Sequence, residues 1–110
     1  MNILREIGRE YKAAGNIMLA GAMEQLHEMG IKNCHHDTRR ALLLVYSEPA
    51  SGERLLFEIS ASVYTGRIVI RYRGGEARAG GLCPACRVRW RKNCGRELVS
   101  AMRMLINTGV

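Results

Sequence analysis

No stretch of this sequence is long and apolar enough to cross a bilayer, and no catalytic motif stands out. A membrane-spanning helix needs about 20 apolar residues. Residues 1–12 mix charged and apolar side chains where a signal peptide has a continuous apolar core. A glycine-rich phosphate loop, a nucleophile elbow and paired carboxylates at a suggestive spacing are all lacking. We therefore expect a cytoplasmic protein that has no membrane partner and is not an enzyme.

Aromatic residues are scarce as well, at 5% of the 110 residues, while apolar residues make up 47% and charged residues 25%. This is the composition of an ordinary globular protein. The length suits one hydrophobic core and is too short for two. We expect residues 1–110 to form a single domain, and no internal repeat divides it.

Acidic residues are nearly missing from the second part of the chain. Residues 1–65 carry seven Lys or Arg and eight Asp or Glu, a net charge of −1, whereas residues 66–110 carry ten and two, a net charge of +8. This asymmetry indicates a basic surface whose partner is polyanionic or acidic. The alternative is a generally basic protein kept in solution by its charge.

The first part of the chain has the pattern of a long helix. Apolar residues recur every three to four positions from residue 2 to residue 29, with Asn2 as an N-cap and Gly30 in the left-handed C-cap position. The pair Gly15 and Asn16 is a point at which this helix could divide. Small residues along it permit close approach by another element of the chain or by a second copy, so a homodimer through this helix stays open.

Three strands are predicted after the helix, over residues 40–46, 54–63 and 67–73: the first is a short apolar run ended by a turn signal, and the other two alternate between two faces. Short loops join them, which favours a three-stranded antiparallel meander with one covered face. In the last strand, Ile68, Ile70 and Tyr72 alternate with arginines. The uncovered face of that strand is therefore expected to be rich in arginine.

A helical pattern returns from about residue 88 to residue 107. Two helices on one face of a meander form a two-layer α+β domain, which is the predicted fold class. Before that helix, a glycine-rich connector over residues 73–82 leads into a cysteine-containing segment, residues 83–94.

This segment is predicted to bind a structural zinc ion. Cys83 and Cys86 have the two-residue spacing that is typical of zinc knuckles, and Cys94 follows eight residues later. In a reducing compartment clustered cysteines are more often metal ligands than disulfides. The competing interpretations are free thiols, a redox-active pair and a disulfide.

The fourth zinc ligand is expected in the segment Cys34, His35 and His36. We choose Cys34 because four thiolates suit a closed structural site. In a simple meander the start of the first strand and the end of the third lie at opposite ends of the sheet, so the connector has to run back along it. The alternative is a polar loop with one buried thiol.

Nine residues of the second part are predicted to bind a partner: Arg67, Arg71, Arg73, Arg78, Arg87, Arg89, Trp90, Arg91 and Lys92. The planar fork of arginine suits phosphate. Trp90 and Tyr72 offer flat surfaces on which bases can stack. No reading helix is recognisable, so we expect binding to the shape or backbone of RNA or DNA. The alternative is an inhibitor or adaptor that docks on an acidic surface of a larger nucleoprotein complex.

Overall fold

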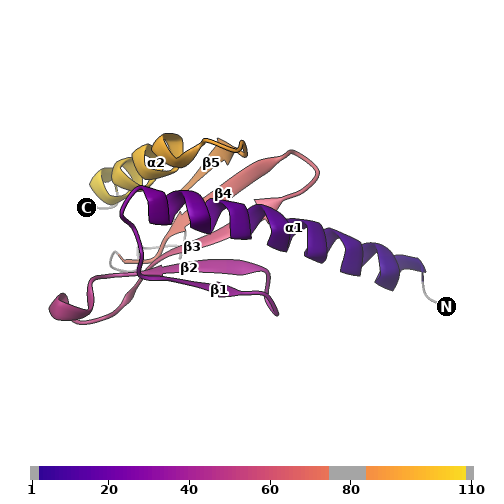
Figure 1. Cartoon of the computed structure of the whole chain (residues 1–110), viewed down its shortest axis with the longest axis horizontal. Coiled ribbons are helices and arrows are strands. Elements are labelled where there is room, and N and C mark those ends of the chain that lie inside the picture. Colours follow the sequence, from indigo (N-terminus) through magenta and orange to yellow (C-terminus); the bar gives the residue numbers. More distant parts are fainter. Residues whose placement is uncertain (1–2, 75–83, 109–110) are drawn as a thin grey trace.

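The computed structural model describes residues 3–74 and 84–108, which form two helices and a five-stranded sheet (Figure 1). The elements in chain order are α1 (Ile3–Glu28), β1 (Cys34–Asp37), β2 (Leu42–Tyr46), a short 3-10 helix η1 (Pro49–Ser51), β3 (Leu55–Ser62), β4 (Arg67–Tyr72), β5 (Ala85–Arg89) and α2 (Gly95–Thr108). The predicted α+β class is confirmed.

All five strands are antiparallel to their neighbours, and their order in the sheet is their order in the chain, β1-β2-β3-β4-β5. One face of the sheet carries a continuous apolar row in which Leu43, Ile59, Ile70 and Cys86 lie opposite one another in register. Apolar side chains of α1 and α2 belong to the same buried cluster as this row, so both helices cover the same face. The other face is left without a helix.

The prediction of three strands is wrong, because the sheet has two further strands at its edges. β1 lies in the segment expected to be a polar ligand-bearing loop, and β5 lies where the knuckle was expected to lead into the last helix. An edge strand pairs on one side only, so it needs less apolar alternation than the middle strands. As a consequence α2 begins at Gly95, later than the expected residue 88, and ends at Thr108.

The long first helix is confirmed and is not divided at Gly15. Gly30 follows it with φ +88°, and the amide of Ile31 donates to the carbonyl of Leu26, so the left-handed C-cap is confirmed. The expected N-cap, Asn2, and residues 75–82 of the glycine-rich connector lie outside the described residues.

The segment between β5 and α2 is held under α1. The indole Nε1 of Trp90 donates to the carbonyl of Met18 at 3.0 Å, and the side-chain amide of Gln25 donates to the carbonyl of Arg91 at 2.8 Å. Gly21 allows this approach, because a Cβ at this position would lie 3.1 Å from the Trp90 ring. At Gly21 the close approach is thus made within the chain.

The N-terminal turns of α1 extend beyond the sheet (Figure 1), and residues 3–13 are all exposed. Their apolar side chains include Ile3 and Leu4, which are 68% and 79% exposed. Neither helix, over the residues described, is long and apolar enough to span a membrane.

Two glycines of α1 test this packing. Replacing Gly15 with Ala should raise the free energy of unfolding by about 1 kcal/mol, because alanine favours the helix and its Cβ would meet Val63 and Ala61 at 3.8 and 3.9 Å. The same change at Gly21 should give no gain or a loss, because the hydrogen bond to Met18 holds the Trp90 ring in the way. Urea unfolding of both variants measures the difference, and equal gains at the two positions would contradict this packing.

Candidate functional site

The face of the sheet opposite the helices carries arginines on β4 and β5. Ile68, Ile70 and Val88 point into the core, so the residues between them point away from the helices. In register, Arg67 lies opposite Arg89, and Arg87 lies opposite Val69. We call the set Arg67, Arg71, Arg73, Arg87 and Arg89 the arginine face. The expectation of an arginine-rich uncovered face on the last predicted strand is met, and β5 extends it.

Two members of the arginine face are engaged by the neighbouring strand β3. Arg73 forms an ion pair with Glu58, with 2.9 Å between Nη2 and Oε2, and Arg71 donates to the hydroxyl of Ser60 at 3.3 Å. Both β3 residues lie on the uncovered face, because Glu58 is opposite Arg71 and Ser60 is opposite Val69. These contacts orient two of the five guanidinium groups.

The other three arginines, Arg67, Arg87 and Arg89, are exposed and make no ion pair within residues 3–74 and 84–108. Like charges directly opposite each other on a sheet are destabilising, and Arg67 faces Arg89 in this way. The described part of the chain supplies no carboxylate that offsets this repulsion. A bound anion would offset the repulsion between Arg67 and Arg89.

The remaining predicted partner-binding residues do not join the arginine face. Arg78 lies outside the described residues. Arg91 and Lys92 are exposed in the loop after β5, which leads to the helix side of the sheet. Trp90 packs against α1 through the contacts given above, and Tyr72 is half-buried against Phe57, with 5.3 Å between ring centroids. The two aromatic rings expected to stack on bases are thus part of the packing on the helix side.

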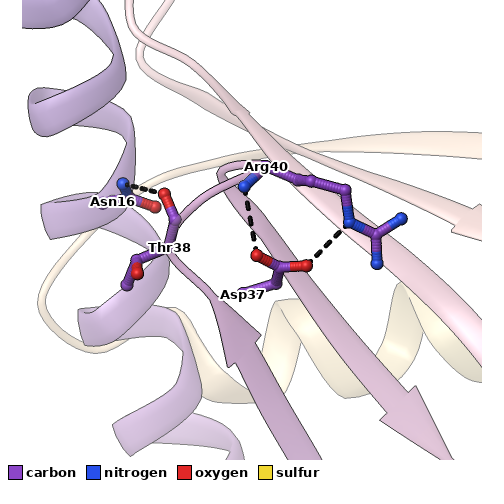
Figure 2. A network of polar contacts seen from close by, with 4 residues as sticks. All are labelled: Asn16, Asp37, Thr38 and Arg40. Carbon is purple, nitrogen blue, oxygen red and sulfur yellow. Dashed lines mark hydrogen bonds and ion pairs between the residues drawn. The ribbon is translucent and has the colours of Figure 1, made fainter.

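The β1–β2 turn is held by polar contacts (Figure 2). Asp37, at the end of β1, accepts hydrogen bonds from the backbone amide and the Nε of Arg40 at 3.1 and 2.7 Å. These bonds hold the pKa of the half-buried Asp37 carboxyl below its usual value and raise the pKa of Arg40. The carboxylate therefore keeps the β1–β2 turn in a fixed shape.

Asn16 ties this turn to α1. Its amide nitrogen donates to the carbonyl of Thr38 at 3.0 Å (Figure 2), and its amide oxygen lies 3.0 Å from Nε2 of His36. With the amide oriented by Thr38, the oxygen accepts and His36 donates. His36 is therefore engaged in positioning the turn and is not directed toward a cysteine cluster.

The three described cysteines are distributed over the fold. Cys34 lies on β1 and Cys86 on β5, the two edges of the sheet, and four strand spacings of about 4.8 Å separate them by roughly 19 Å. A zinc ion holds each thiolate at about 2.3 Å, so this strand order does not allow one ion to bind both. Cys94 is buried in the core, and Cys83 lies outside the described residues.

No group of three or more His, Cys, Asp or Glu side chains in the described ranges could hold a metal ion. Cys34 donates to the carbonyl of Ile31 at 3.6 Å, and burial raises the pKa of its thiol, which disfavours the thiolate that binds metal. The predicted zinc site stays a prediction whose ligands would have to come from Cys83, Cys86 and their surroundings.

Comparison with known proteins adds no information on this site: no protein-family model matches the sequence, and neither a curated protein nor a solved structure matches it.

Measuring zinc content tests whether Cys34 is a zinc ligand. We expect protein purified without chelator to carry the same zinc per chain whether position 34 is Cys or Ser, because the strand order places Cys34 and Cys86 on opposite edges of the sheet. A Cys86→Ser variant is the matched control for a site in residues 83–94. Loss of zinc from Cys34→Ser with the fold retained would show that Cys34 is a ligand.

Thiol reactivity should follow burial and pKa. In a Cys83→Ser background, a thiol reagent should modify the half-buried Cys86 first, then Cys34, whose raised pKa leaves less thiolate at neutral pH. Cys94 is 1% exposed and should react only on unfolding. Mass spectrometry of a labelling time course gives the order, and early labelling of Cys94 would contradict its burial.

Proposed function

We propose that this protein binds nucleic acid through the arginine face and that it does so through the phosphate backbone. The observation that carries the proposal is the register of β4 and β5, which gathers Arg67, Arg87 and Arg89 on one exposed surface without an acidic partner in the described part of the chain. Arginine forms bidentate, charge-assisted hydrogen bonds to phosphate, which are stronger than hydrogen bonds between neutral groups.

The shape of this surface favours backbone contact over base reading. No described helix lies on this face, and strands of a broad sheet do not enter a groove as a single helix or a two-stranded ribbon does. Phosphate contacts position a protein on nucleic acid without carrying sequence information. We therefore expect affinity that depends strongly on salt and weakly on sequence.

A protein partner with an acidic surface remains the competing proposal, because a carboxylate satisfies the same guanidinium groups. The two proposals differ in the affinity that they predict for free nucleic acid. A nucleic-acid-binding face holds an oligonucleotide by itself, with log affinity falling linearly with log salt. A face built for an acidic protein has only weak, non-specific affinity for the same oligonucleotide.

The double variant Arg67→Gln, Arg89→Gln tests the proposal. Removing two phosphate contacts should weaken oligonucleotide binding at least tenfold and make the log–log salt slope shallower by about 1.4 for a single strand or 1.8 for a duplex. Fluorescence anisotropy at several salt concentrations gives both values. The fold should be retained, because both side chains are exposed.

The matched control is Arg96→Gln, Arg103→Gln, which removes the same charge from exposed positions of α2, the helix that covers the opposite face of the sheet. Its affinity and salt slope should stay close to those of the unchanged protein. Equal losses in the two double variants would mean that net charge, and not the arginine face, determines binding. No affinity of the unchanged protein for any oligonucleotide at moderate salt would favour the acidic protein partner.

A further inference from the structure

A groove of about 290 Å³ lies where α1 passes over the end of the sheet, between the β1–β2 and β3–β4 turns. Its lining comes from three segments that are distant in sequence. The residues that matter here are Tyr11 and Lys12 of α1, Arg40 of the β1–β2 turn and Tyr64 of the β3–β4 turn. Both aromatic and cationic side chains thus meet at one place.

Two tyrosines form a stacked pair at this groove. The rings of Tyr11 and Tyr64 have centroids 5.3 Å apart and planes 21° from parallel. The neighbouring Tyr64 side chain is the main reason why the pKa of the Tyr11 hydroxyl is raised. The chain has only six aromatic residues, and two of the six lie together at this groove, outside the core.

Tyr64 contributes little to the core, because it is 87% exposed while Tyr11 is 39% exposed. A stacked ring with so much free surface keeps one face open to solvent. The turn that carries it is held firmly: Gly66 adopts φ +65°, and its carbonyl accepts a hydrogen bond from the amide of Trp90 at 2.9 Å. The ring is therefore presented on a fixed support.

Cations border this aromatic surface. Lys12 and Arg40 line the groove. The ion pair of Arg40 with Asp37 uses only Nε, so both Nη groups lie outside it (Figure 2). Arg67 of the arginine face begins β4 just after the turn that carries Tyr64. A polyanion on the arginine face would reach Lys12 and Arg40 by passing round the β3–β4 turn to the helix side of the sheet.

We propose that the groove takes one unpaired base, stacked on the open face of Tyr64, with an adjoining phosphate held by Lys12 and Arg40. This inference rests on the proposed function and narrows it to single-stranded nucleic acid. In a duplex the base faces are covered by their neighbours, whereas in a single strand a base can turn out and stack on an aromatic side chain. Because every base has such a face, the site tolerates any sequence.

The test compares a single-stranded oligonucleotide without self-complementarity and the blunt duplex of the same sequence. The unchanged protein should bind the single strand more tightly. Tyr64→Ala should weaken single-strand binding about tenfold without changing the salt slope, because it removes a stacking contact and no phosphate contact. Duplex binding should be unaffected.

Tyr64→Phe is the matched control, since it keeps the ring and loses only the hydroxyl. It should retain most of the single-strand affinity. Lys12→Gln should instead make the single-strand salt slope shallower by about 0.7, the contribution of one phosphate contact. Thermal unfolding of each variant confirms that the fold is kept, as the exposure of Tyr64 leads us to expect.

The outcomes separate this inference from the proposed function. If the unchanged protein binds neither oligonucleotide, both are overturned. If the unchanged protein binds with salt dependence and Tyr64→Ala has the same single-strand affinity, the base site is overturned and the arginine face remains. A preference of the unchanged protein for the duplex has the same meaning. A loss in Tyr64→Ala that is as large on the duplex as on the single strand would also overturn base stacking.

Discussion

The alternation of side chains along β4 and β5 is the constraint on which the rest of the structure depends. Along both strands one face supplies Ile68, Ile70 and Val88 to the core beneath the helices, and the other supplies the arginine face. A shift of the pairing by one residue would place guanidinium groups under α2 and apolar groups in water. The same register that stabilises the core therefore assembles the cationic surface.

The single tryptophan couples this surface to the rest of the chain. Trp90 directly follows Arg89, and its ring is bonded to α1 while its amide is bonded to the β3–β4 turn. Any movement of the end of β5 would break both contacts. Arg89 and the turn that bears Tyr64 are thus linked to α1 through one residue, Trp90, whose backbone amide bonds the turn and whose ring bonds α1 on the covered side of the sheet.

The sequence was sufficient to predict the helices and strands with strong apolar periodicity, and insufficient to predict the two edge strands of the sheet. α1, β2, β3 and β4 follow from their apolar repeats, and the outward direction of Arg67 and Arg71 follows from strand alternation. β1 was missed because Cys34–Asp37 has almost no apolar residue, and β5 was missed because its cysteine suggested a metal ligand. Tyr64 falls in the short loop expected between residues 54–63 and 67–73, and an aromatic residue in such a loop was the signal for an exposed ring.

The contact between Gln25 and Arg91 joins residues that are 66 positions apart, which has a consequence for folding during synthesis. The strands pair with sequence neighbours, so the sheet can form strand by strand as the chain leaves the ribosome. α1 is made first, but part of its buried surface lies against the segment after β5. Until that segment emerges, the apolar side of α1 has only an incomplete partner, and a nascent chain that pauses before β5 would expose it to other proteins.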